Sequence, residues 1–137
     1  MKNIFQIKPI LYTLITIFIL LLAFFLFLPF FMPANRTLFP LVAILGFMFF
    51  ILGIMLMFLA KKEKGKLKVF LMLTGFGAIA PLAGSILHNL FYALSIAFTG
   101  LKTFFEVLHA GFFILAILVA PVLFIAGIVG SIFYLRD

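Results

Sequence analysis

The chain has no cysteine and very few acidic residues, and both shortages limit the chemistry it can perform. Without cysteine there can be no disulfide, no Cys-ligated zinc and no Cys-ligated iron–sulfur cluster. Asp and Glu together supply 3 of the 137 residues, so a full di-metal carboxylate site cannot be assembled. Phosphate loops, nucleophile elbows, zinc-protease helices and dinucleotide fingerprints are also missing from the sequence. These absences favour a role other than that of an enzyme.

Charge of either sign is scarce as well, which bears on the solvent of the protein. Charged residues make up 9% of the chain and hydrophobic residues 68%. A soluble domain is roughly one quarter charged and about half apolar, so this excess of apolar side chains needs a lipid bilayer around it. We therefore expect an all-α integral membrane protein, a four-helix bundle located in the cytoplasmic membrane of a prokaryote.

Four hydrophobic segments are each long enough to cross a hydrocarbon core as a helix, which takes about 20 residues. A single membrane domain is predicted, with spans over residues 9–32, 40–60, 67–98 and 104–135. The third and fourth spans exceed the required length and must tilt or bend. Pro81 and Pro121 mark the expected bends, since each removes a backbone hydrogen bond.

Basic residues are concentrated in the short loop 61–68 between the second and third spans. The lysines of this loop are Lys61, Lys62, Lys64, Lys66 and Lys68. Lys and Arg favour cytoplasmic loops, so we expect this loop and both termini to lie inside (N-in/C-in), leaving only Arg36 and Lys102 outside. No aromatic side chains interleave with the lysines, so the loop predicts contact with anionic lipid head groups and not with nucleic acid.

Small residues spaced four apart gather in the second half of the chain. The pairs are Ala80 with Gly84, Ala116 with Ala120, Ala126 with Gly130, and Gly127 with Ser131. Helices in lipid associate through close contact and polar bonds, since lipid offers no hydrophobic driving force between them. We therefore expect the third and fourth spans to form a tightly packed hairpin and the first two to form a lipid-facing pair.

A stripe of polar residues runs along one face of the third span, at alternating steps of four and three. Inside a membrane such a stripe must face protein, water or a ligand. If the chain turns near residues 100–102, His109 of the fourth span is level with Tyr92 and offset from His88 by half a turn to one turn. The candidate residues of this polar seam are Ser85, His88, Tyr92, Ser95 and His109. Asn89, also a candidate, follows His88 directly and points off the stripe by about 100°, where we expect it to bond a neighbouring helix or another subunit.

Glu106 and His109 form an E-x-x-H pair, the spacing with which some helical proteins hold a metal ion. With His88 added, the set has two histidines and a carboxylate, which suits iron or zinc, and two histidines alone suit haem. A structural interpretation competes with this one. Thr103 and Glu106 match a capping box, and His109 would bond Tyr92 or main chain across the hairpin.

Three functions stay open at this point. The first is a small four-span membrane protein that acts by association, as an accessory, scaffold or self-assembling subunit. The second is a membrane protein that binds haem or a divalent metal through His88 and His109. The third is a small transporter, or a proton or solute channel, with its polar path along the third helix. The expected partners are membrane lipids, and other membrane subunits or further copies of the chain.

Overall fold

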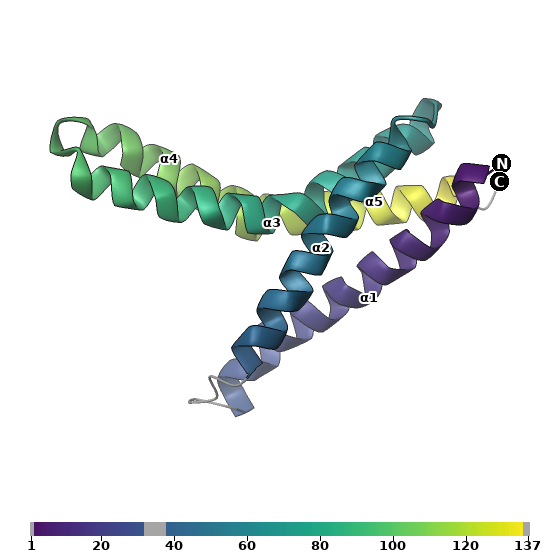
Figure 1. Ribbon diagram of the computed structural model, residues 1–137, viewed down its shortest axis with the longest axis horizontal. Helices are drawn as coiled ribbons and strands as arrows, with labels where there is room; N and C mark the ends of the chain where they lie inside the picture. Colours follow the sequence, from purple (N-terminus) through teal and green to yellow (C-terminus); the bar gives the residue numbers. More distant parts are fainter. Residues whose placement is uncertain (1, 32–37, 136–137) are drawn as a thin grey trace.

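The expected all-α architecture is confirmed. The computed structural model describes residues 2–31 and 38–135, so Arg36 and Arg136 lie outside the described residues. The elements are α1 (Lys2–Phe31), α2 (Phe39–Ala60), α3 (Gly65–Ala97), a short 3₁₀ turn η2 (Thr99–Leu101), α4 (Lys102–Ile114), a π-helical turn η3 (Leu115–Val119) and α5 (Ala120–Leu135) (Figure 1). Four helices are long and apolar enough to cross a membrane, the last being the continuous run Thr99–Leu135.

Several helix ends differ from the predicted spans, and α3 begins at Gly65, two residues before the predicted start at residue 67. α1 begins at Lys2 and passes through Pro9, which the sequence suggested as its first residue. α4 begins at Lys102, two residues before the predicted start at residue 104. α2, by contrast, opens with Pro40 in its first turn as expected, where the missing N–H costs nothing.

The helices form two hairpins that diverge from a shared end (Figure 1). One hairpin is α1 with α2, and the other is α3 with α4 and α5. One end of the molecule holds the first turns of α1, the start of α3 and the last turns of α5. There the hairpins share one apolar core, whose buried residues are Ile7, Leu11, Leu14, Ile17, Phe49, Leu56, Ala60, Leu71, Ala78 and Phe124.

α3 lies between α2 and α5, and glycines permit close approach on both of its sides. Towards α5, a Cβ built on Gly77 would lie only 2.6 Å from the main-chain nitrogen of Phe124. Towards α2, a Cβ built on Gly53 would lie 2.9 Å from Cβ of Ala78. The tightly packed second hairpin is therefore confirmed. The first two spans are largely exposed, as a lipid-facing pair would be, but they also pack on the second hairpin, because α2 contacts α3 and both α1 and α2 supply core residues.

A π-helical turn, η3, interrupts the second half of the second hairpin between α4 and α5. Pro121, just after it, has no N–H to continue the regular series of helical backbone hydrogen bonds. A π turn accommodates such a missing bond within a continuous helix. Ala116 of η3 is buried against Gly84 of α3, where a Cβ would meet the alanine Cβ at 2.9 Å. Beyond this contact the hairpin continues as residues 85–114, here called the arm, which extends away from α1 and α2 (Figure 1).

Candidate functional site

Two histidines bind each other across the arm. The rings of His88 in α3 and His109 in α4 stack with centroids 3.8 Å apart and planes inclined by 21°. Nδ1 of each ring lies 3.0 Å from the main-chain oxygen of the other histidine. A carbonyl oxygen only accepts hydrogen bonds, so in both rings Nδ1 carries the hydrogen and donates it. This reciprocal arrangement, here called the histidine clasp, joins α3 to α4 by two hydrogen bonds and one stacking contact.

The clasp corrects the predicted register of the hairpin. His109 was expected level with Tyr92 and offset from His88, yet it stacks on His88 and lies 5.3 Å from the Tyr92 ring centroid. The cause is the turn: α3 ends at Ala97 and α4 begins at Lys102, so the midpoint of the hairpin comes earlier in the chain than assumed. The expected bond from His109 to main chain across the hairpin is confirmed.

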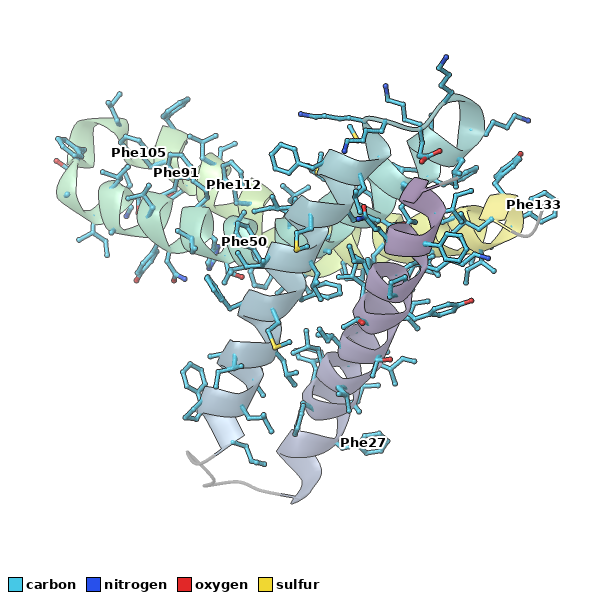
Figure 2. All side chains as sticks on the ribbon, turned by 45° about the vertical axis from the view of Figure 1, so that its right-hand side comes forward. Phe27, Phe50, Phe91, Phe105, Phe112 and Phe133 are labelled. Atoms are coloured by element: carbon cyan, nitrogen blue, oxygen red, sulfur yellow. The ribbon has the colours of Figure 1, made fainter. Side chains whose placement is uncertain are left out.

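Aromatic rings extend the clasp and fill the rest of the arm. Tyr92 flanks the clasp on the His109 side, and Phe113 flanks it on the other side at 5.2 Å from His88. A second group of stacked rings joins the same two helices, with Phe91 lying between Phe105 and Phe112 (Figure 2). Both histidines are half-buried in this aromatic setting. The arm is therefore held together by stacked rings and by the two clasp bonds.

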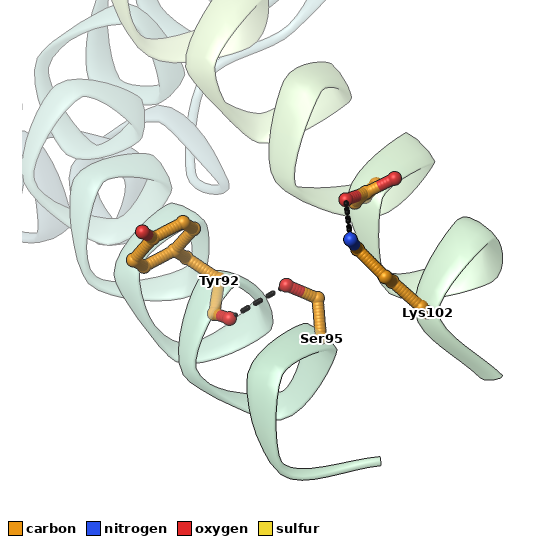
Figure 3. A network of polar contacts seen from close by, with 4 residues as sticks. Tyr92, Ser95 and Lys102 are labelled. Atoms are coloured by element: carbon orange, nitrogen blue, oxygen red, sulfur yellow. Dashed lines mark hydrogen bonds and ion pairs between the residues drawn. The ribbon is translucent and has the colours of Figure 1, made fainter. Parts of the chain in front are cut away.

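The predicted polar seam does not form one continuous wall facing α4. Ser95 is buried, and its hydroxyl donates to the main-chain oxygen of Tyr92 at 2.8 Å (Figure 3). Ser85 and Asn89 are exposed, and both donate to main-chain oxygens one turn earlier in α3. Tyr92 is 54% exposed. Because hydroxyl and amide groups can bond their own helix in this way, a polar stripe need not face a second helix.

The clasp geometry does not suit a shared metal ion or haem. A neutral imidazole offers its lone pair in the ring plane, and a metal sits about 2 Å from that nitrogen. The two ring planes are stacked and nearly parallel, so both Nε2 lone pairs cannot meet at one ion, nor approach one haem from opposite faces, unless the rings separate. Within the described residues, no group of three His, Asp or Glu could hold a metal, so the predicted set of His88, Glu106 and His109 is not assembled.

Glu106 has a different role from both predicted ones. The capping box with Thr103 is wrong, because the N-cap of α4 is Leu101, with no side-chain bond to the helix end. The Glu106 carboxylate instead lies 3.7 Å from the ammonium group of Lys102, one turn earlier on α4 (Figure 3). Both side chains are more than half exposed. An exposed pair of this kind contributes little to stability.

Replacing Glu106 with glutamine should therefore change the free energy of unfolding by no more than about 0.5 kcal/mol, the usual range for exposed ion pairs one helical turn apart. Unfolding by SDS in mixed micelles, followed by circular dichroism, measures this change. Lys102→Met is the matched control, because it breaks the same pair from the other side. A loss of about 1 kcal/mol or more for Glu106→Gln alone would contradict this minor role of the carboxylate.

The lysines of residues 61–68 are all exposed, as a surface that meets lipid head groups requires. The predicted loop is shorter than expected, because α3 begins at Gly65 and Lys66 and Lys68 lie in its first turn. Gly65 opens α3 with a φ of 63°, a backbone conformation that glycine adopts without strain. The ammonium group of Lys61 lies 5.1 Å from the centroid of the Phe58 ring, in the last turn of α2. Contact between this loop and anionic lipid, and its position on the cytoplasmic side, stay predictions.

The site is thus a hairpin arm closed internally by the histidine clasp, with Asn89 and Tyr92 on its outer surface. Comparison with known protein families, curated proteins and solved structures finds no match for this chain, so no function is carried over from a relative.

Proposed function

We propose that this protein is a small multi-pass membrane subunit that acts by lateral association, through the outer surface of its arm. The observation that carries the proposal is the exposed position of Asn89 on a hairpin that only its own two helices cover. The expected partner is another transmembrane surface, either on a different membrane subunit or on a second copy of this chain.

The arm buries very little of itself. Every residue of α4 keeps part of its surface accessible, and Ser95 is the only buried residue among the described residues 85–114. Large apolar side chains cover the outside, where lipid or another helix would contact them. The most exposed are Ile86, Ile96, Phe98, Leu101, Phe104 and Val107. The arm therefore has free faces on which a partner helix could pack.

Asn89 distinguishes one of these faces from a surface suited to lipid alone. Its amide nitrogen donates one hydrogen bond, to the main-chain oxygen of Ser85 at 2.9 Å. A primary amide has a second N–H and a carbonyl oxygen, and leaving these groups unpaired in hydrocarbon costs free energy. A polar partner on a neighbouring helix satisfies them, and interhelical bonds of this type contribute about 0.6–2 kcal/mol in membranes.

The same geometry favours association over the two alternatives. Both clasp Nδ1 atoms are engaged inside the arm and the rings stack face to face, which does not fit shared ligation of a metal or haem. Ser85, Asn89 and Tyr92 lie on the outside of the hairpin. They are therefore poorly placed to line a transport path enclosed between α3 and α4.

Replacing Asn89 with leucine, which has a similar volume, should weaken association about three- to thirtyfold, because one interhelical polar contact is lost. Single-molecule photobleaching in lipid vesicles gives the dissociation constant if the partner is a second copy. Cross-linking in the native membrane followed by mass spectrometry identifies any other subunit.

Thr16→Val is the matched control, because it removes an exposed membrane hydroxyl from α1 and leaves the arm intact. Its association should equal that of the unmodified chain. The proposal fails if the chain is monomeric and without partners in its native membrane, or if Asn89→Leu and Thr16→Val associate equally well.

A further inference from the structure

A groove between α1 and α5 lies well away from the arm, towards the end where the two hairpins meet. Its lining residues are Lys8, Leu11, Tyr12, Ile132 and Leu135, and it encloses about 320 Å³. This volume is at the lower end of the range for small-molecule sites in proteins. The groove opens to the outside of the helix bundle, so a bound molecule could extend from it into the surrounding bilayer.

The groove combines an apolar floor with hydrogen-bond donors along one edge. Leu11 is buried in its floor, and Ile132 and Leu135 of α5 are half-buried. Lys8 and Tyr12 lie one turn apart on α1, and both are exposed. Residues at this spacing lie on the same side of a helix, so the ammonium and phenol groups can reach one bound group together. The described lining residues include no carboxylate, so none of them neutralises the Lys8 charge.

The groove also lies where lipid head groups are expected. Lys8 is in the second turn of α1, close to the start of the apolar span Ile4–Phe27. Lysine at such a depth extends its charged end towards the head-group region, and tyrosine prefers that region as well. The positive charge, the phenol and the apolar floor match the order of groups along a phospholipid, with the phosphate outermost and the acyl chain below it.

We infer that this groove binds one anionic phospholipid, with its phosphate on Lys8 and Tyr12 and the beginning of an acyl chain on Leu11, Ile132 and Leu135. The ammonium group pairs with the phosphate, and the phenol O–H donates a second hydrogen bond to it. Such a lipid would fill the space between α1 and α5 and hold the first hairpin against the second. The inference does not depend on the arm or on its association.

Native mass spectrometry of the purified protein tests the inference, with phosphatidylglycerol and phosphatidylcholine of the same acyl chains as probes. One phosphatidylglycerol should be retained in preference to phosphatidylcholine. Lys8→Gln should weaken its binding about fivefold, the effect of one lysine at an anionic membrane surface. Lys8→Arg should keep the affinity within about twofold, because it keeps the charge.

Two further variants separate this groove from general surface charge. Lys102→Gln, at the exposed far end of the arm, should leave the retained lipid in place. Ile132→Phe keeps Lys8 but fills the groove, and it should lower the affinity as Lys8→Gln does. If phosphatidylcholine binds equally well, if Lys102→Gln weakens binding as much as Lys8→Gln, or if neither groove variant has an effect, the inference is overturned. Displacement of the lipid by millimolar inorganic phosphate would also overturn it, because the site would then recognise free phosphate.

Discussion

Replacing Gly77 with alanine should destabilise the protein by about 1–3 kcal/mol, the usual cost of forcing an extra carbon into a packed interface. A Cβ at this position would lie 2.6 Å from the main-chain nitrogen of Phe124 and 2.7 Å from its Cα. These are backbone atoms, which cannot rotate away as the end of a side chain can. α3 and α5 would have to separate, and helices in lipid depend on such close packing because no hydrophobic force replaces it.

Separating α3 from α5 would also disturb the packing at the centre of the shared apolar core. Phe124 is fully buried, and its ring lies 4.7 Å from that of Phe18 and 4.9 Å from that of Phe49. These rings come from α5, α1 and α2, so a displacement of α5 disturbs contacts with both helices of the first hairpin. The loss of stability in Gly77→Ala should therefore lower the free energy of global unfolding, and not only increase the local mobility of the second hairpin.

Gly111→Ala is the matched control for this prediction. Gly111 lies inside α4, and a Cβ built on it meets nothing within 4 Å. Alanine is the better helix former by up to about 1 kcal/mol, so this variant should be neutral or more stable. Unfolding by SDS in mixed micelles compares the two proteins directly. Equal stability of Gly77→Ala and Gly111→Ala would mean that α3 and α5 are not in close contact at Gly77.

The number and type of the helices could be predicted from sequence because the bilayer allows few alternatives. A chain that crosses hydrocarbon must satisfy its backbone hydrogen bonds internally, and a helix of about 20 residues does so. The contact between α2 and α3 was not predictable in the same way. Gly53 is an isolated small residue in α2, and its role depends on Gly75 and Ala78 of another helix, which no spacing along the chain links to it.

The residues of the candidate site were identifiable, but their geometry was not. Polar side chains in an apolar segment indicated both His88 and His109. Their pairing depends on where the hairpin turns, and starting α4 two residues early shifts the facing residues by about 3 Å along the axis. A shift of this size decides whether two rings stack or are offset. The outward direction of Ser85 was hidden for another reason, since its hydroxyl bonds its own helix.

The histidine clasp gives the second prediction, a double-mutant cycle in which the stability losses of the two single variants are not additive. His88→Ala and His109→Ala should each lower the free energy of unfolding by about 1–2 kcal/mol, because each loses one interhelical hydrogen bond and the stacking of the rings. The main-chain oxygens remain in both variants. Each single variant therefore removes one donor bond and the stacking contact, whereas the double variant removes both bonds but loses the stacking contact only once.

The sum of the two single losses should therefore exceed the loss in the double variant by the stacking energy, about 0.5–1.5 kcal/mol. Stability is measured by SDS unfolding, and hydrogen exchange of the arm amides shows whether the loss is local. His109→Phe keeps a ring and removes the donor, whereas His109→Asn keeps a donor and removes the ring. Strictly additive losses would contradict a clasp in which the two rings touch. If His109→Phe is as stable as the unmodified chain, the bond from His109 Nδ1 adds nothing to stability, and the His109 ring acts through stacking alone.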